Sequence, residues 1–387
     1  MPAYRTRVVN LAALTDLRRR PLSRCLGRVL GEPVHALVDV PGFDSSAMDG
    51  FALRHTDTGR VQVDCVVAAG AAPSALADGC AARIMTGAPV PHGADTVVPF
   101  EDAQVDQTPD AGDHVVVDSP LTPGQHVRRR GEDVTVGDIV LPAGRTLRAA
   151  DLAAAAAVGH AELMVRRRPR VAVVTTGDET QAPGEPLAPG QVYESNGTFL
   201  LAALRRAGAR VVALQHCPDQ RERLTHLFDE LSERADLLLV AGGISAGDYD
   251  VVRDVLADYV VHVKMKPGKP QAAGTWRQTP IIALPGNPVS AAASFAVFVA
   301  PWLDHALGRT AQPRTARTAQ AWTSRAGVTH LLPITLNTPD GTCLARPATA
   351  QGSHLVASLA LADGWAIVPE HLTNVVAGTT VEVLCLA

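Results

Sequence analysis

The sequence predicts a multidomain α/β plus β protein whose centre is a mostly parallel α/β sheet domain. Between residues 169 and 301, short β-branched runs are followed by Gly- or Pro-containing loops, and several of these loops lead into helix-period segments. This alternation is typical of βαβ units. Short extended runs separated by Gly, Pro and Asp occupy about residues 55 to 125 and the end of the chain after residue 313. They indicate two smaller β domains, the second of them a barrel or sandwich.

Within the central domain, the apolar pattern predicts alternating strands and helices. We expect strands at 171–175, 210–215, 236–241, 260–265 and 280–284, and helices at 196–207, 219–234, 249–258 and 288–304. Ser195 or Asn196 would cap the first helix, and Gly208 would end it. The loops that follow such strands gather at one edge, where open α/β sheets bind ligands.

Two of these loops combine glycine with carboxylates. Thr176, Gly177 and Glu179 follow the first expected strand, and the run GGISAGDYD follows the third. That run contains Gly242, Gly243, Ser245, Gly247, Asp248 and Asp250. Glycine lets an anionic ligand approach the backbone amides, and carboxylates can hold a hard cation such as Mg²⁺. The combination predicts a phosphorylated ligand bound together with a metal.

Two further loops on the same expected edge add positive charge and a helix start. Lys266 and Lys269 flank a Pro-Gly turn. The other loop consists of Pro285, Gly286, Asn287 and Pro288. Asn287 suits the N-cap of the helix at 288–304, and Pro288 suits its first position. A single loop of this kind is explained as a turn or a cap, but four polar loops on one edge favour a binding site.

Before the central domain, the sequence predicts a helical domain interrupted by the smaller β domain. Residues 8–38 are expected to be helical, with an apolar stripe that includes Leu26, and an Ala-rich helix is expected at 148–158. We assign residues 1–54 and 126–168 to this helical domain, 55–125 to the inserted β domain, 169–312 to the α/β domain and 313–387 to the C-terminal β domain.

Candidate polar loops also occur outside the central domain. Asp49 lies in a loop rich in Asp and Ser, Thr86 lies beside a glycine turn, and two residues separate the run from Arg128 to Arg130 from Asp133. Turn formation explains such loops without a ligand, because Asp and Ser bond to their own backbone. A contribution to a metal or phosphate site is the alternative. For His354, near the end of the chain, a structural role is the better explanation.

Composition excludes several classes of protein. The apolar fraction of 47% and the charged fraction of 19% are ordinary for a globular chain. The net charge of −4 favours neither nucleic acid nor an anionic membrane as a partner. The six cysteines show no CxxC spacing, which predicts buried free thiols in a reducing compartment. No uninterrupted apolar run reaches about 18 residues and no signal peptide is recognisable, so we expect a cytoplasmic location.

The motifs taken together resemble those of the molybdopterin molybdenumtransferases, the MoeA family that includes the gephyrin E domain. Nine collinear segments carry the resemblance: PGFDSSAMDGFAL, RIMTGAPVPHGADTVVPFED, RRRGEDVTVGDIVLPAG, VAVVTTGDE, YESN, GGISAGDYD, KPGKP, LPGNPVSA and GSHLVASLALADG. The resemblance covers nearly the whole chain. It implies a helical dimerisation domain, an inserted β domain, a molybdopterin-binding α/β domain and a C-terminal β barrel. It also implies a homodimer whose active site is shared between the α/β domain of one subunit and the first two domains of the other.

The resemblance further implies a reaction. The substrates would be adenylylated molybdopterin and molybdate, with Mg²⁺, and the products would be molybdenum cofactor and AMP. A molybdopterin adenylyltransferase and molybdoenzyme-specific chaperones would be partners. Two other activities remain open, namely adenylylation of molybdopterin and a non-catalytic role as a pterin-binding scaffold.

Roles for the candidate residues follow from the same resemblance. Glu179 with Asp248, Asp250 or both would hold Mg²⁺ against the pyrophosphate, and Lys266 and Lys269 would balance phosphate charge. Asp49, Thr86 and Asp133 would close the site from the partner subunit, while Pro285 and Pro288 would shape a loop. Because molybdate is an anion, either Mg²⁺ inverts the local charge or molybdate binds elsewhere, against the run from Arg128 to Arg130 or against backbone amides.

Overall fold

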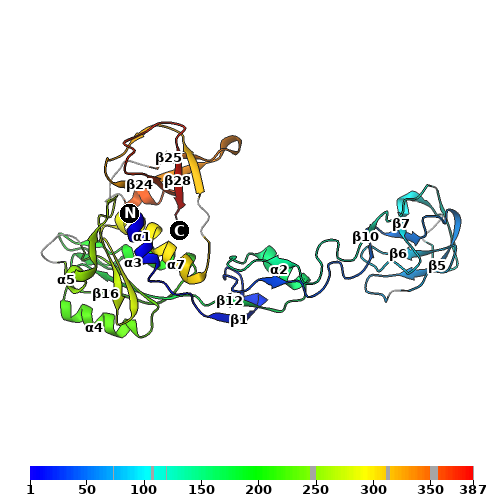
Figure 1. Ribbon diagram of the computed structural model, residues 1–387, viewed down its shortest axis with the longest axis horizontal. Helices are drawn as coiled ribbons and strands as arrows, with labels where there is room; N and C mark the ends of the chain where they lie inside the picture. Colours follow the sequence, from blue (N-terminus) through cyan, green and yellow to red (C-terminus); the bar gives the residue numbers. More distant parts are fainter. Residues whose placement is uncertain are drawn as a thin grey trace.

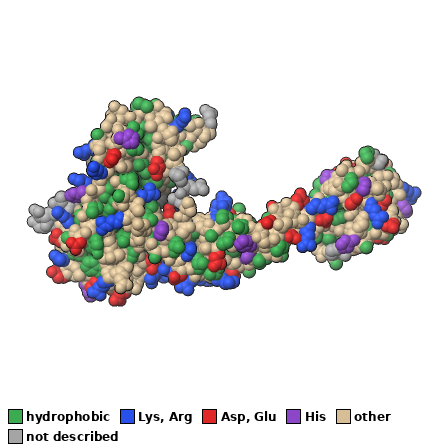
Figure 2. Space-filling view, in the orientation of Figure 1, with side chains coloured by type: hydrophobic (Ala, Val, Ile, Leu, Met, Phe, Trp, Pro, Cys, Tyr) green, Lys and Arg blue, Asp and Glu red, His purple; other side chains and the backbone are tan. Residues whose placement is uncertain are grey.

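The computed structural model describes residues 1–72, 74–105, 109–118, 120–244, 250–310, 314–348 and 356–386. The molecule is elongated (Figure 1). An α/β body and a C-terminal barrel lie at one end, a small middle body follows, and an outer β body lies at the far end. The molecule narrows between the middle body and the outer β body (Figure 2).

The α/β body contains a six-stranded sheet with the order β16-β13-β17-β21-β20-β18. Its strands are β13 (Arg170–Thr176), β16 (Arg210–Cys217), β17 (Leu237–Ala241), β18 (Val260–His262), β20 (Pro270–Trp276) and β21 (Thr279–Leu284). Its helices include α3 (Asn196–Arg206), α4 (Arg221–Ser232), α5 (Val251–Val255), α6 (Pro288–Ser294) and α7 (Ala300–Leu307), and the short turn η3 (Ala257–Tyr259) follows α5. The pairs of β13 with β16, β13 with β17 and β17 with β21 are parallel. These elements confirm the predicted mostly parallel α/β domain.

Helices cover both faces of this sheet, which explains why its central strands are continuously apolar. Val171 and Val173 pack into one buried cluster, whereas Ala172 and Val174 pack into another. Successive side chains of a strand point to opposite faces, so a strand buried on both faces cannot alternate with polar residues. All five residues of β17 are accordingly buried.

Strand β20 was not predicted from the sequence, and it pairs antiparallel with both β21 and β18. A two-residue connection, Arg277 and Gln278, joins β20 to β21, and both residues have positive φ, 44° and 73°. Hairpin turns of this geometry usually contain Asn or Gly. The turn signal was therefore missing from the sequence.

The helix after β21 runs to Leu307 as the continuous series α6, η4 (Phe295–Val299) and α7. The η4 segment is a π-helix that ends two positions before Pro301, which has no N–H to donate to the preceding turn. The segment Pro288–Leu307 is long and apolar enough to cross a membrane by length and composition. It is nevertheless 72% buried inside the protein, as expected for the core helix of a globular body.

Helix α1 (Pro2–Val9) packs on the α/β body. The rings of Tyr4 and Phe298 meet edge to face with their centroids 4.8 Å apart. The Arg7 guanidinium also donates to the carbonyl of Ala273 at 2.8 Å. Residues 1–54, which we assigned to the first domain, thus begin on the α/β body with α1 and continue into the middle body.

The helix expected over residues 8–38 is wrong beyond Val9. Strand β1 (Leu17–Pro21) pairs with β12 (Glu162–Arg166), and β2 (Val34–His35) pairs with β11 (Ile139–Leu141). A short turn, η1 (Leu22–Arg24), separates β1 from β2. Pro21 and Pro33 cannot continue a helical hydrogen-bond pattern, and Leu26, which the helical stripe would bury, is 60% exposed. In contrast, α2 (Ala149–Ala157) confirms the Ala-rich helix, and Gly159 follows it with a φ of +99°.

The outer β body contains a six-stranded sheet with the order β7-β4-β6-β5-β9-β8. Its strands are β4 (Gly50–Leu53), β5 (Gly59–Val67), β6 (Cys80–Ile84), β7 (Thr96–Pro99), β8 (Ala103–Gln104) and β9 (His114–Val117), with the turn η2 (Phe100–Asp102). The strands β3 (Ser45–Ser46) and β10 (Val127–Arg128) pair where the chain enters and leaves this body.

The C-terminal body is a closed barrel, as predicted. Its strands are β22 (Arg314–Thr318), β24 (Thr329–Asn337), β25 (Leu344–Pro347), β26 (Gly364–Val368) and β28 (Thr380–Cys385). The additional pair of β24 with β26 closes the ring. Shorter elements are β23 (Trp322–Thr323), β27 (Asn374–Val375), η5 (Pro339–Gly341) and α8 (Val356–Leu359). His354 lies outside the described residues.

The six cysteines are all free, but their burial differs from the expectation. Cys25 and Cys217 are buried, Cys385 is exposed and the other three are intermediate. Only part of the prediction of buried thiols is therefore correct.

Asp151 in the first turn of α2 leads to a stability prediction. Its carboxylate is 4% exposed, lies 2.8 Å from the Arg145 guanidinium and accepts from the Arg148 amide at 2.8 Å. Arg145 first, and then Arg148, holds the pKa of Asp151 well below its usual range. A lowered pKa contributes stability that is present above about pH 4 and is lost as the pH falls.

We expect Asp151→Asn to lower the opening free energy of α2 by about 2 kcal/mol at pH 7. The difference from wild type should narrow below about pH 4. Hydrogen exchange of the α2 peptide, measured by mass spectrometry at pH 7 and below pH 4, checks the loss of opening free energy and its dependence on pH. As a control, Asp138→Asn removes an exposed carboxylate that bonds Thr135 within its own turn, and it should leave α2 unchanged. A pH-independent difference would contradict the assigned role of the carboxylate.

Candidate active site

A cleft of about 570 Å³ lies at the carboxyl edge of the α/β sheet. It is formed by the loops that follow β13, β17 and β21 and by the first turns of α3 and α6. The candidate residues that line it are Thr176, Gly177, Glu179, Ser195, Asn196, Gly242, Gly243, Asp250, Lys269, Pro285, Gly286, Asn287 and Pro288. The structure therefore brings the four loops of the sequence analysis to one place.

Glycines allow these loops to approach one another closely. Gly242 has a φ of +106°, and a Cβ there would lie 2.7 Å from the carbonyl oxygen of Thr176. A Cβ at Gly286 would lie 3.3 Å from the Cα of Gly242. The loops after β13, β17 and β21 are in near van der Waals contact, which larger residues at these positions would prevent.

The first turn of α3 is held by Glu194 and not by the expected capping residue. Ser195 occupies the N-cap without a side-chain hydrogen bond. The Gly197 amide instead donates to both carboxylate oxygens of Glu194, at 2.9 and 3.1 Å. The side-chain amide of Asn196 donates to the carbonyl of Gly286 at 2.7 Å, so it fastens α3 to the loop before α6.

Helix α6 begins as predicted, with Asn287 at the N-cap and Pro288 in the first turn. The Asn287 side chain makes no capping hydrogen bond. The N-termini of α3 and α6 both line the cleft, and their backbone dipoles favour negative charge on a ligand.

Four buried side-chain oxygens of the cleft have no hydrogen-bond partner within the described residues. They are Thr176 Oγ1, Asn196 Oδ1, Asp219 Oδ1 and Asn287 Oδ1. A buried polar atom without a partner costs roughly 1–3 kcal/mol. Because four such atoms gather around one cleft, they indicate a polar ligand that donates hydrogen bonds to them.

The described lining contains four carboxylates, those of Glu179, Glu194, Asp219 and Asp250, and one lysine, Lys269. Burial raises the pKa of Asp219, and the nearby charges of Asp178 and Glu179 raise it further. An anionic ligand would be repelled by this set unless a cation accompanied it.

The carboxylates of the cleft have oxygen atoms, which are the ligands that Mg²⁺ prefers. Among the described segments, no group of three or more His, Cys, Asp or Glu residues could hold a metal ion. Mg²⁺ typically takes one or two protein carboxylates and completes its shell with water and substrate phosphates. Glu179 and Asp250 line the same cleft and fit this pattern.

Some expected site residues are not in the described cleft. Ser245, Gly247 and Asp248 lie outside the described residues. Lys266 does not line the cleft, because its strand β19 (Met265–Lys266) leaves the α/β sheet and pairs with β24 of the barrel. There Lys266 faces His330, whose pKa is lowered to about 4 by burial and, less strongly, by the charge of Lys266.

Asp49, Thr86 and Asp133 are far from the cleft of their own chain. Asp49 directly precedes β4 and Thr86 follows β6 of the outer β body, and Asp133 follows β10 in the connection back to the middle body. The outer β body and the α/β body lie at opposite ends of the molecule (Figure 1). Asp49 accepts from the Thr86 amide at 2.6 Å and from its hydroxyl at 2.8 Å. These bonds, the amide bond first, hold the pKa of the exposed Asp49 carboxyl below its usual range.

Two arginines of the run from Arg128 to Arg130 already have carboxylate partners. Arg129 pairs with Asp44 at 2.7 Å, and Arg130 pairs with Asp39. These pairs fasten the two chain segments that connect the middle and outer bodies. The Arg129 and Arg130 side chains are thus less available to an oxyanion than the sequence suggested.

The sequence analysis missed several residues of the cleft, among them Thr180, Tyr193, Asp219, Gly268 and Ser290. The motif YESN pointed to the region of Tyr193 and Glu194 but not to their separate roles. Asp219 follows β16, so its position after a strand of the same sheet was the available signal.

Three family models together match most of the chain. Residues 3–159 match the family described as MoeA N-terminal region (domain I and II), residues 172–305 match Probable molybdopterin binding domain, and residues 315–386 match MoeA C-terminal region (domain IV). The order of the three matches is that of a MoeA protein. A crystal structure of a MoeA protein from Pyrococcus horikosii superposes with a TM-score of 0.82 at 30% identity, covering 100% of this chain and 98% of that one.

Curated relatives are similar to this chain over more than nine-tenths of its length. Molybdopterin molybdenumtransferase 2 of Mycobacterium tuberculosis is 42% identical over 94% of this chain and 93% of the relative. The molybdopterin molybdenumtransferase of Synechococcus elongatus is 34% identical over 96% and 94%. The chain therefore belongs to the molybdopterin molybdenumtransferase family.

The close approach of the loops predicts how a substitution at Gly242 acts. We expect Gly242→Ala to lower the free energy of unfolding of the α/β body by about 3 kcal/mol, because it combines a positive φ with a clash against Thr176. Gly190→Ala is the matched control. Gly190 also has a positive φ, but nothing lies within 4 Å of its added Cβ, so we expect a loss of about 1 kcal/mol. Denaturant unfolding followed by Trp276 and Trp302 fluorescence measures the free energy of unfolding of each variant. Equal losses in Gly242→Ala and Gly190→Ala would contradict the clash with Thr176.

Proposed function

We propose that this protein transfers molybdenum from molybdate to adenylylated molybdopterin and releases AMP. Membership of the molybdopterin molybdenumtransferase family supports the reaction. The observation that carries the proposal is the gathering of unpartnered oxygens, helix N-termini and carboxylates around one cleft of about 570 Å³. A cleft of this size is suited to a ligand of cofactor dimensions.

In this proposal, the chain holds the ligand through two kinds of contact. The N-termini of α3 and α6 and the Lys269 ammonium bind the phosphate groups. The unpartnered oxygens of Asn196, Asp219 and Asn287 accept hydrogen bonds from N–H and O–H groups of the ligand, which a pterin and a ribose provide. The glycines of the loops leave room for the ligand to reach the backbone.

Magnesium is part of the same proposal. Glu179 and Asp250 would hold the ion, together with or in place of Asp248. When bound, Mg²⁺ would neutralise phosphate charge and so allow molybdate to approach an otherwise acidic cleft.

We further propose that the protein acts as a homodimer, in which Asp49, Thr86 and Asp133 of the partner subunit close the cleft. Their distance from the cleft within one chain supports this arrangement. Exposed apolar side chains on and beside the middle body also support it. They are Leu37, Val38, Phe43, Met48, Val136 and Ile139, which are between 38% and 63% exposed. A cytoplasmic location, and partners that supply adenylylated molybdopterin or accept the product, belong to the same proposal.

The reaction is tested with purified protein, adenylylated molybdopterin, Mg²⁺ and molybdate. We expect AMP release that depends on molybdate. Consumption of ATP with free molybdopterin would indicate adenylylation instead, and binding without either reaction would indicate a scaffold.

A carboxylate variant tests the role of the cleft. Asp250→Ala should lower turnover roughly a hundredfold or more and weaken its dependence on Mg²⁺, because a metal ligand is lost. Asp254→Ala is the matched control, since Asp254 is an exposed carboxylate one turn further along α5 that does not line the cleft. Wild-type turnover in Asp250→Ala, or equal losses in both variants, would remove Asp250 from the site.

Subunit mixing tests the shared site. Asp49→Ala and Glu179→Ala should each be inactive alone. Random mixing gives half heterodimers, each with one intact site, so activity should recover to about a quarter of wild type. If verified heterodimers stay inactive, the site lies within one chain.

A further inference from the structure

A second pocket, of about 540 Å³, lies at the junction of the middle body and the α/β body. Eight of its ten lining residues are arginines, and the other two are Ala209 and Val211. The total charge of the protein is −4, so this concentration of positive charge is a local feature. We refer to it as the arginine pocket.

The arginine pocket is separate from the candidate active site. Arg170 and Arg210 are the first residues of β13 and β16, so the pocket lies at the amino edge of the sheet. The candidate active site lies at the carboxyl edge. No residue lines both pockets.

Distant segments contribute the arginines. Arg18 and Arg20 come from β1, and Arg28 comes from the loop after it. Arg18 and Arg20 share one face of β1, because residues two apart in a strand point the same way. Arg19, between them, instead lines a different pocket beside Glu32 and Glu162.

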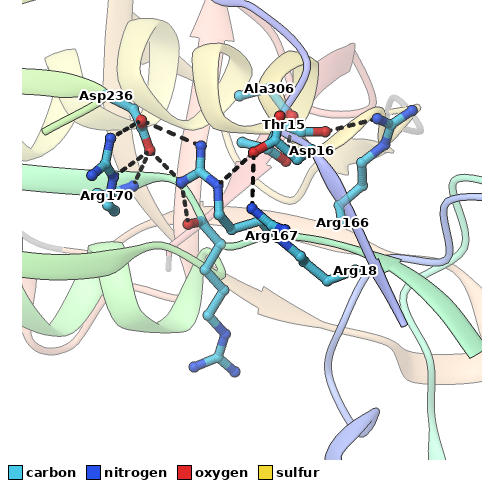
Figure 3. A network of polar contacts seen from close by, with 9 residues as sticks. Thr15, Asp16, Arg18, Arg166, Arg167, Arg170, Asp236 and Ala306 are labelled. Atoms are coloured by element: carbon cyan, nitrogen blue, oxygen red, sulfur yellow. Dashed lines mark hydrogen bonds and ion pairs between the residues drawn. The ribbon is translucent and has the colours of Figure 1, made fainter. Parts of the chain in front are cut away.

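The connection between the two bodies supplies Arg167, Arg168 and Arg170. Two carboxylates, those of Asp16 and Asp236, form ion pairs with some of the pocket's arginines (Figure 3). Asp236 lies 2.6 Å from Arg167 and 2.9 Å from Arg170, and Asp16 lies 3.5 Å from both Arg167 and Arg18. Neither carboxylate lines the pocket itself.

The remaining five arginines have no ion pair within the described residues. They are Arg20, Arg28, Arg168, Arg205 and Arg210. The Nε of Arg168 is buried and has no hydrogen-bond partner. Burial, followed by the charges of Arg168 and Arg20, lowers the pKa of Arg28. Like charges held together in this way destabilise a protein unless an anion joins them.

We propose that the arginine pocket binds a polyvalent phosphate, that is, a chain of two or three linked phosphate groups. Guanidinium groups bind phosphate oxygens through paired N–H donors, and several of them around one pocket favour a ligand with several phosphates. The lining contains no aromatic or amide side chain that would recognise a base. A ligand bound there would join β1, the connection at residues 167–170 and the α/β body, so it would also restrain the two bodies relative to each other.

Isothermal titration calorimetry of the full chain with sodium tripolyphosphate tests the proposal. We expect saturable binding by wild type. The double variant Arg28→Gln/Arg168→Gln should weaken binding at least tenfold. The control is Arg19→Gln, which removes one positive charge from the face of β1 opposite Arg18 and Arg20, outside the pocket, and should change affinity less than about threefold. Lys269→Gln should also retain binding, because Lys269 lines the other cleft.

Titration with ATP and measurement of the melting temperature test the proposal in two further ways. ATP also carries three linked phosphates. A pocket that binds the phosphates and makes no specific contact with the base or the sugar should bind ATP and tripolyphosphate with equal affinity. The double variant should melt at a higher temperature than wild type at low salt without ligand, because repulsion is reduced, and tripolyphosphate should raise the melting temperature of wild type only.

Four outcomes would overturn the proposal. They are absence of binding by wild type, equal losses in Arg19→Gln and in the double variant, loss of binding in Lys269→Gln, and ATP binding more than tenfold tighter than tripolyphosphate.

Discussion

The close approach of three backbone loops at the carboxyl edge of the α/β sheet governs the candidate active site. The loops after β13, β17 and β21 come so near that a single Cβ at Gly242 would clash with Thr176. Parallel pairing of these strands puts their carboxyl ends side by side, and glycine removes the side chains that would keep the loops apart. The side-chain oxygens of Thr176, Asn196, Asp219 and Asn287, which have no hydrogen-bond partner within the described residues, gather around the same cleft.

Charge is divided between the two edges of this sheet. The carboxyl edge gathers carboxylates, which repel anions unless a cation accompanies them. The amino edge gathers arginines at the connection to the middle body, and only Asp16 and Asp236 offset them through ion pairs within the described residues. A protein with modest net charge thus contains two strongly charged sites of opposite sign.

Much of the α/β body could be predicted because its strands and helices are strongly periodic. β20 could not, because its turn at Arg277 and Gln278 lacks Asn and Gly. The expected helix over residues 8–38 failed because Pro21 and Pro33 interrupt it, and the apolar spacing was given more weight than these two breakers. In the cleft, the glycines and the start of α6 were predictable as turn and cap signals. The role of Glu194 was not predictable, because it depends on its hydrogen bonds to the Gly197 amide, and Asp219 offered only its position after β16 as a signal.

The sequence by itself determined the alternation of strands and helices, the glycine loops and the family resemblance, since all three depend on residues close together in the chain. Only the tertiary structure decided that α1 packs on the α/β body, that Lys266 belongs to the barrel junction and that the outer β body lies at the opposite end of the molecule from the α/β body. It alone brought arginines from β1, residues 167–170, α3 and β16 into one pocket. Contacts between distant segments depend on how whole bodies pack, and no local pattern of residue types encodes that packing.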